Sequence, residues 1–188
     1  NARGNNGETA FMIACEFGHK EVVQLLLENS NIDLKARDNH GWTAFIVACS
    51  RGHKDVVQLL LEHSERIELN SRSNRGFNAF IWACKIGHQD IVQLLLNHSE
   101  RIELNARGNN GETAFMIACE FGHKEVVQLL LENSNIDLKA RDNHGWTAFI
   151  NACSRGHKDV VKLLLDHSER FDLNAKDNNG RTALMIAS

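Results

Sequence analysis

Proline is absent from this sequence of 188 residues. The turns of the chain must therefore rely on glycine and asparagine, which enter tight turns at low cost. No run of 18 apolar residues occurs, so no segment has the length of a membrane-spanning helix. A basic excess is also missing, since 24 acidic side chains outnumber 21 basic ones and leave a net charge of −3. A partner held mainly by its phosphates needs a basic stripe, so neither nucleic acid nor a membrane is expected as a partner.

Enzyme and secretion signals are missing as well. The sequence has no Gly-x-Ser-x-Gly, no glycine-rich phosphate loop before a lysine and no His-Glu-x-x-His. Residues 3–7 contain glycine but precede no strand–helix phosphate site. We therefore expect no enzymatic activity and no cofactor. No charged-then-apolar leader opens the chain, and its first residue is asparagine, so we expect that an initiator methionine was removed or that the segment was cut from something longer.

Repetition dominates what the sequence does contain. Residues 1–46 return letter for letter at 105–150, an offset of 105 − 1 = 104 residues. Along the whole chain the tetrad Gly-x-Thr-Ala, once Gly-x-Asn-Ala, recurs at steps of 34, 35, 35, 34 and 35 residues. It starts at Gly7, Gly41, Gly76, Gly111, Gly145 and Gly180. Such a period is typical of a stacked array, in which each repeat packs only on its neighbours. An array of this kind has no unique place for a catalytic centre, but it has a long, graded surface.

We predict a single array that fills the chain. Its repeats 1 to 6 are expected at about 1–34, 35–69, 70–104, 105–138, 139–173 and, in part, 174–188. The offset between the two copies equals three repeat steps, since 34 + 35 + 35 = 104, so a three-repeat cassette was duplicated.

Five cysteines recur once per repeat, and none forms the Cys-x-x-Cys pair of a zinc site. They are Cys15, Cys49, Cys84, Cys119 and Cys153. If each repeat advances the stack by about one helix diameter, neighbouring cysteines lie ~10 Å apart. A disulfide requires Cα atoms within about 7 Å. We therefore expect reduced, buried thiols, and with them an intracellular, cytoplasmic location or a recombinant origin.

Repeat 2 illustrates the expected structure of one repeat. Thr43 is suited to cap a short helix over residues 44–50, and Gly52 is expected to end it. A second helix is predicted from about Asp55 to Glu62, apolar around most of its circumference. His63 and its asparagine or histidine equivalents are expected to stop this helix in the left-handed conformation. The polar segment that follows, called a finger here, is expected to extend and to turn at the glycine of the tetrad.

These residues resemble the ankyrin-repeat family. The family pattern D-x-x-G-x-T-P-L-H-x-A-A-x-x-G-H-x-x-V-V-x-L-L-L is matched at 142–165 by D-N-H-G-W-T-A-F-I-N-A-C-S-R-G-H-K-D-V-V-K-L-L-L. The resemblance covers the whole chain in six registers. It implies an all-α solenoid of stacked antiparallel helix pairs with protruding β-hairpin loops, and a protein that binds other proteins. The chain departs from the family where Thr-Pro-Leu-His becomes Thr-Ala-Phe-Met or Thr-Ala-Phe-Ile, which removes a proline and a hydrogen-bonding histidine.

The resemblance also implies where a partner would bind: the finger tips and the concave side of the first helices. Positions that differ between repeats fall there, including the two that follow the finger aspartate or its substitute, such as Asn39 with His40 and Asn74 with Arg75. The candidate binding residues are Glu8, Trp42, Arg51, Phe77, Trp82, Lys85, Glu112, Trp146, Asn151, Arg155 and Arg181. The first hot-spot candidates are Trp42, Phe77 and Trp146, followed by Trp82 and Arg51, because tryptophan and arginine dominate interface energetics. In the alternative interpretation, the aromatic side chains pack on the neighbouring finger and bind nothing.

Two further groups of residues are interpreted as structural. Phe17 and Phe121 are expected to pack rather than to contact a partner. Five of the ten histidines follow glycine in the turn between the two helices of a repeat, at His19, His53, His88, His123 and His157. The family uses such histidines to tie the turn to neighbouring backbone. No two histidines or cysteines fall at ligand spacing on one helix, so no metal is expected.

The copied block bears on the origin of the chain. Identity over 46 consecutive residues, surface positions included, is hard to keep in an old duplication. One hypothesis is a synthetic or recombined array that serves as a non-catalytic protein-binding scaffold. A second is a natural intracellular adaptor with recently duplicated repeats, and a third is a purely structural scaffold without a ligand. Any partner is expected to be a protein, whose identity the residues do not give.

The ends of the array carry one more expectation. Repeat 1 is identical to repeat 4, so it lacks the polar outer face that normally covers the end of a solenoid. The last predicted repeat holds a single helix. We expect a monomer whose terminal helices fray first or pair end to end with another molecule.

Overall fold

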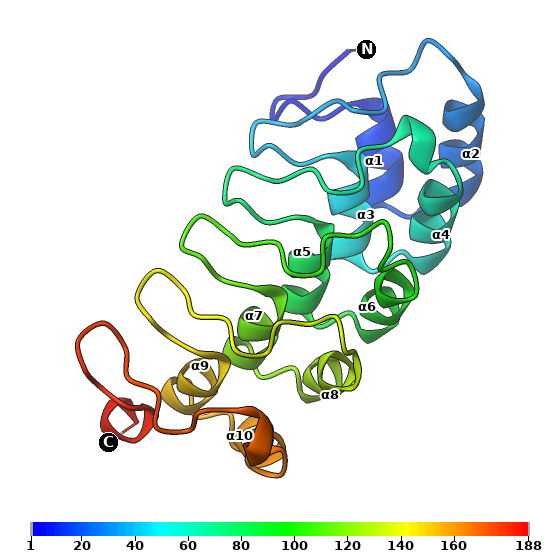
Figure 1. Cartoon of the computed structure of the whole chain (residues 1–188). Helices are drawn as coiled ribbons and strands as arrows, with labels where there is room; N and C mark the ends of the chain where they lie inside the picture. Colours follow the sequence, from blue (N-terminus) through cyan, green and yellow to red (C-terminus); the bar gives the residue numbers. More distant parts are fainter. Residues whose placement is uncertain (1, 188) are drawn as a thin grey trace.

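The computed structural model describes residues 2–187 as two parallel rows of helices with a row of loops on one side (Figure 1). The first helices of the repeats are α1 (Ala10–Glu16), α3 (Ala44–Arg51), α5 (Ala79–Ile86), α7 (Ala114–Glu120), α9 (Ala148–Ser154) and α11 (Ala183–Ile186). The second helices are α2 (Lys20–Glu28), α4 (Lys54–Glu62), α6 (Gln89–Leu96), α8 (Lys124–Glu132) and α10 (Lys158–Leu165). Short 3-10 helices η1 (Ser64–Arg66) and η2 (Ser168–Arg170) follow α4 and α10. The all-α stack of helix pairs confirms the predicted solenoid.

A capping side chain fixes where each long first helix begins. Thr43 Oγ1 accepts a hydrogen bond from the backbone N–H of Ile46 at 3.4 Å, and the threonines before α1, α7 and α9 do the same. In repeat 3 the same position is Asn78, whose Oδ1 accepts from the N–H of Ile81 at 3.0 Å. Both residue types satisfy one of the free N–H groups of a helix start. This explains why the tetrad accepts asparagine in place of threonine.

Glycine ends the first helix because two constraints coincide there. Gly52 follows α3 with a φ of 78°, in the left-handed region that side chains disfavour. A Cβ atom at this position would also lie 2.8 Å from Cε1 of His88 in the next repeat. The close approach of neighbouring repeats therefore needs glycine as much as the turn does.

The left-handed stop predicted for the second helices is wrong. No residue other than glycine has a positive φ among residues 2–187, and His63 has a φ of −108°. Its Nδ1–H instead donates to the carbonyl oxygen of Leu59 at 3.0 Å. In repeat 1, Asn29 accepts a hydrogen bond from the N–H of Asn31 at 2.9 Å. The histidine ring thus satisfies a carbonyl of the last turn directly, whereas Asn29 stabilises the turn that follows the helix.

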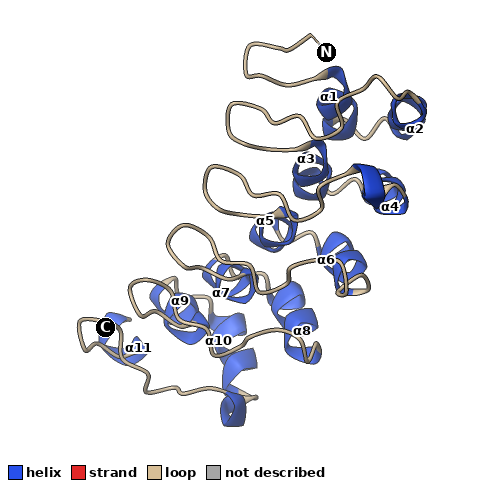
Figure 2. Cartoon of the chain, turned by 45° about the horizontal axis from the view of Figure 1, so that its top comes forward, coloured by secondary structure: helices blue, strands red, loops and turns tan. Residues whose placement is uncertain are grey.

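The fingers turn at glycine as predicted, although they contain no assigned strand in the part of the chain that the structure describes. In repeat 2 the backbone carbonyl of Asp38 accepts a hydrogen bond from the N–H of Gly41 at 3.0 Å. The backbone N–H of Asp38 donates to the carbonyl of Trp42 at 3.0 Å. The Asp38 carboxylate accepts two more backbone N–H groups, from His40 and Trp42. Figure 2, coloured by secondary structure, shows the fingers as loops that project from the row of first helices.

Core columns run through the stack. The column of Phe11, Phe45, Phe80 and Phe115 is 2% exposed or less, and the place of the family's histidine is filled by equally buried Met12, Ile46, Ile81, Met116 and Ile150. All buried side-chain polar atoms in residues 2–187 have a hydrogen-bond partner. The five cysteines are free thiols, and four of them are buried in this core. The loss of the family's histidine therefore leaves no buried side-chain polar atom of residues 2–187 without a hydrogen-bond partner.

Two hydrogen-bonded ladders join one finger to the next. In the first, the N–H of Asn74 donates to His40 at 2.9 Å, and its Nδ2 donates to Asn39 at 3.1 Å. In the second, the guanidinium of Arg37 donates to the carbonyl of Arg72 at 2.8 Å, and Arg72 donates to Arg107 at 2.9 Å. The asparagine position was assigned to the variable set, but it is asparagine in all six repeats and has a structural role.

No helix of residues 2–187 is long and apolar enough to cross a membrane.

Candidate binding surface

The predicted binding residues fall on one side of the array, which we call the finger face. It consists of the exposed side of the first helices and the finger tips at 5–8, 39–42, 74–77, 109–112, 143–146 and 178–181. Not all eleven candidates are accessible there. Arg51, Arg155 and Arg181 are exposed, and Glu8, Trp42, Lys85, Glu112 and Trp146 are half-buried. Phe77, Trp82 and Asn151 are buried, at 5%, 7% and 7% exposure.

Trp42, Trp82 and Phe77 form an aromatic cluster between repeats 2 and 3. The ring centroid of Trp82 lies 4.6 Å from that of Trp42 and 5.5 Å from that of Phe77. The indole N–H of Trp82 donates to Ser73 Oγ at 3.4 Å. Phe77 in turn packs on the next finger, since a Cβ atom on Gly108 would lie 2.3 Å from Phe77 Cε1. Phe77 and Trp82 therefore pack inside the protein, as the alternative interpretation predicts. Trp82 contacts the half-buried Trp42, and Phe77 supports Trp82.

A hollow of about 490 Å³ opens beside this cluster, lined by His40, Trp42, Asn74, Arg75, Trp82 and Lys85. Nζ of Lys85 lies 3.4 Å from the ring centroid of Phe121 in the next repeat. Burial lowers the pKa of Lys85, while the nearby carboxylates of Glu120 and Glu112 oppose that shift. The hollow thus combines an indole surface with two cations. Arg75 was placed among the variable tip positions but not among the candidate binding residues, although it is the only cation among the six equivalent tip positions apart from histidine.

Phe17 and Phe121 pack against neighbouring side chains, yet both rings keep an exposed part. Phe17 is 63% exposed and Phe121 is 41% exposed. Their rings stack on His19 and His123, at centroid distances of 6.0 and 6.4 Å. The copied sequence gives the same stacking in both cassettes, but only Phe121 has a preceding repeat whose lysine covers it.

The turn histidines tie each repeat to the one before it. Nε2–H of His53 donates to the carbonyl of Glu16 at 2.7 Å, and His88 donates to Ser50 at 2.9 Å. His123 and His157 make the same bond. Among residues 2–187 no three histidines, cysteines or carboxylates are placed to hold a metal ion. The structural assignment of these four histidines is confirmed.

The comparison with known families agrees with this geometry. A family model described as ankyrin repeats (3 copies) matches residues 1–73, 65–142 and 134–188, which together span the whole chain. The chain belongs to the ankyrin-repeat family. A search of the curated proteins found no match. Ankyrin repeats are protein-interaction modules and are generally not enzymes, so membership identifies the type of protein without naming a partner.

Ion pairs occupy most of the cations on the finger face of this ankyrin array. Arg51 pairs with Glu16 at 2.5 Å, Arg155 with Glu120 at 2.6 Å, and Arg181 with Asp177 at 2.7 Å. The first two pairs are copies of one another in the two cassettes. The two pairs with Glu16 and Glu120 are largely exposed and contribute only about 0–1 kcal/mol each. All three pairs reduce the positive charge offered to a partner.

The two cassettes differ around their copied tryptophans. Trp146 is identical to Trp42 in its local sequence, yet repeat 6 places Asn179 and Arg181 where repeat 3 has Arg75 and Phe77. Asn151, in place of Val47, turns its amide back onto the carbonyl of Thr147 at 3.2 Å. The ankyrin array therefore presents one tryptophan beside unpaired cations and another beside an arginine already held by its own repeat.

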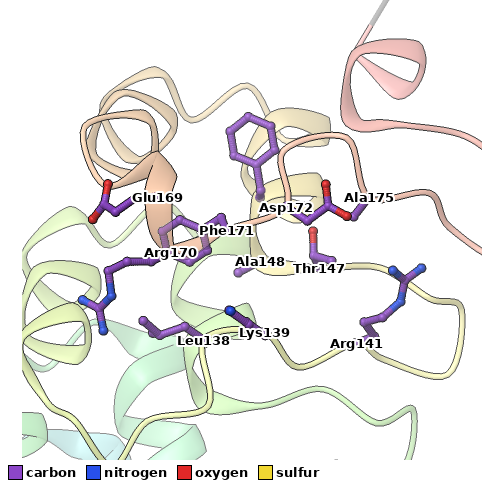
Figure 3. Close-up of a pocket in the computed structure, with 11 residues that line it drawn as sticks. Leu138, Lys139, Arg141, Thr147, Ala148, Glu169, Arg170, Phe171, Asp172 and Ala175 are labelled. Atoms are coloured by element: carbon purple, nitrogen blue, oxygen red, sulfur yellow. The ribbon is translucent and has the colours of Figure 1, made fainter.

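A second hollow, of about 270 Å³, lies at repeats 5 and 6 (Figure 3). Arg170 and Arg141 lie on opposite sides of it in this view, and both donate to backbone carbonyls, of Leu131 and Lys176 respectively. Phe171 beside it stacks on Phe115 with ring centroids 6.0 Å apart. Both arginines that line the hollow are therefore already bonded within the stack.

Proposed function

We propose that this ankyrin-repeat chain is a non-catalytic scaffold that binds a protein partner with its finger face and needs no cofactor. One observation carries the proposal: the residues that change between repeats gather on this face, whereas the core columns stay nearly constant. The asparagine and arginine side chains of the ladders donate to backbone carbonyls of a neighbouring finger, so the other tip side chains are free to vary. A recognition surface requires side chains that can change while the backbone that carries them keeps its structure.

The accessible candidates are those expected to touch the partner. They are Glu8, Trp42, Arg51, Lys85, Glu112, Trp146, Arg155 and Arg181, with Phe77, Trp82 and Asn151 as buried supports. Trp42 is the first hot-spot candidate, because its ring is both partly accessible and fixed by Trp82. Hot spots are typically rigid aromatic or arginine side chains at the centre of an interface.

Affinity capture from cell lysate tests this function. The wild-type chain is compared with Trp42→Ala and Trp146→Ala, and with Gln93→Ala on the exposed side of α6 as a control away from the finger face. We expect a retained protein that is lost with a finger-face variant and kept with Gln93→Ala. An identical set of retained proteins for all four chains would instead indicate a structural scaffold with no ligand at this face.

We further infer that the array was assembled synthetically or by recombination from repeat modules. The 46-residue identity supports this origin, because it includes exposed positions that the fold does not constrain. The Thr-Ala-Phe motif favours modules of natural origin, and a recently duplicated intracellular adaptor is the alternative. Silent differences spread through the DNA that encodes the two copies would contradict assembly by direct copying.

The five free thiols favour a reducing compartment, so an intracellular location is part of the same proposal. We expect a monomer, with end-to-end association as the alternative. Leu25 of repeat 1 is 68% exposed, whereas the identical Leu129 of repeat 4 is half-buried against the core. Sedimentation at increasing concentration distinguishes the two states.

A further inference from the structure

The hollow beside Trp42 differs from the rest of the finger face in its charge. Arg75 is exposed at the tip of the third finger and forms no ion pair among residues 2–187. Lys85 contacts the face of Phe121 and likewise has no ion-pair partner there. These two cations line one hollow, together with His40 from the second finger. Neither cation is therefore held in a direct ion pair within the described part of the chain.

The two carboxylates near Lys85 each accept hydrogen bonds from other residues of the chain. Glu120 is held by Arg155 at 2.6 Å. Glu112 accepts hydrogen bonds from the backbone and side chain of Asn110, at 3.1 and 3.0 Å. Burial lowers the pKa of Lys85, so the ammonium group is held where water solvates it poorly. A negatively charged group of a partner would compensate electrostatically for the solvation that the Lys85 ammonium group has lost.

An apolar surface borders the cations. Trp42 forms one wall and is fixed by Trp82 behind it. The ring of Phe121, which Lys85 contacts, is 41% exposed. The volume of about 490 Å³ lies within the range of ligand pockets, roughly 300–1,000 Å³. A ligand that fits must therefore offer both a negative charge and an apolar side chain.

We propose that this hollow binds an acidic peptide segment of a partner protein, with carboxylates on Arg75 and Lys85 and one apolar side chain against Trp42. The proposal rests on the protein-binding function proposed above and specifies the chemistry of the partner. Electrostatic complementarity of this kind selects partners and accelerates their association.

The copied cassette provides a control within the same chain. Trp146 and His144 repeat Trp42 and His40, but Asn179 replaces Arg75, and the guanidinium of Arg181 is held by Asp177 at 2.7 Å. The second tryptophan thus has the same local sequence without the free cations. If the cations define the site, only the first cassette takes the acidic segment.

Selection of random peptides displayed on phage against the immobilised full chain tests the site. Enriched peptides are synthesised with a fluorescent label, and their affinities are measured by anisotropy. We expect them to carry net negative charge and a large apolar residue. Trp42→Ala should weaken binding at least about tenfold, Arg75→Gln should weaken it about threefold, and Trp146→Ala should leave it unchanged. Arg75 is exposed and bonded to nothing else through its side chain, so this variant keeps the fold.

The results that would contradict the acidic-peptide site differ from those that would contradict the protein-binding function. Neutral or basic peptides, no enrichment, or equal losses for Trp42→Ala and Trp146→Ala each overturn the acidic-peptide site. A single-stranded oligonucleotide that binds as tightly as the peptides also overturns it, in favour of stacking and phosphate contacts. If captured proteins depend on Arg155 or Glu8 instead of Trp42, the site fails while the protein-binding function stands.

Discussion

Gly4 and Gly108 occupy the same place in the two copies of the cassette, and their substitution by alanine should have unequal effects. A Cβ atom on Gly108 would lie 2.3 Å from Phe77 Cε1, whereas on Gly4 it would meet only the flexible end of Glu8, at 2.9 Å. Other repeats carry aspartate or serine at this position, so the backbone there accepts a side chain. Only the ring of Phe77 distinguishes the two sites.

The magnitude follows from two opposing effects. Alanine in place of glycine stabilises a compatible backbone by about 0.4–1 kcal/mol through the unfolded chain. Overpacking against a fixed ring typically costs about 1–3 kcal/mol. We therefore expect Gly108→Ala to lower the free energy of unfolding by about 1–2 kcal/mol and Gly4→Ala to leave it level or slightly raised. Because Phe77 supports Trp82 and through it Trp42, the fluorescence of the cluster should change only with Gly108→Ala.

Urea unfolding of both variants measures the difference. Repeat 1 lies at one end of the described stack and can fray, so a double-mutant cycle gives the cleaner answer. In a Phe77→Ala background the penalty of Gly108→Ala should disappear. A penalty of the same size with and without Phe77 would refute the reasoning.

Three further predictions concern the framework. Asn78→Ala should destabilise the chain by about 1–2 kcal/mol in urea unfolding, because it removes the cap of α5 and the bond from Nδ2 to Glu103 at 2.9 Å. Asn74→Ala should cost about 1 kcal/mol through the asparagine ladder, whereas Asn5→Ala, with no earlier finger to bond, should cost little. Thiol labelling near about pH 8 should modify Cys153 first, because burial raises the pKa of all five thiols but only Cys153 is half-buried and within reach of the reagent, and equal labelling of all five would contradict that order.

The sequence predicted those features that depend on a single repeat. The cap at Thr43, the left-handed Gly52 and the two helices of each pair follow from local chemistry and are confirmed. The ankyrin-repeat pattern predicts the same helix pair and the same glycine turn. Local chemistry also suggested the stop at His63, but there the histidine ring competes with the left-handed backbone and bonds to Leu59 instead.

Features that depend on two repeats escaped prediction. The burial of Phe77 requires the glycine at 108 in the following finger, which no pattern within one repeat reveals. The exposure of Phe17 reflects what lies next to it, not its own sequence, which is copied in repeat 4. The hollow between Trp42 and Arg75 likewise arises from the contact of two fingers. A comparison of adjacent repeats, position by position, could have identified Arg75 as the unusual tip residue.

The central claim is that the finger face around Trp42 contacts a partner protein. The chain has three tryptophans, so a nitrogen-15 NMR spectrum should show three indole N–H signals, which single substitutions assign. On addition of the protein retained in the capture experiment, we expect the Trp42 signal to shift or broaden, together with the amides of Arg75 and Lys85. Unmoved indole signals, with changes confined to the second helices α2 to α10, would contradict the account.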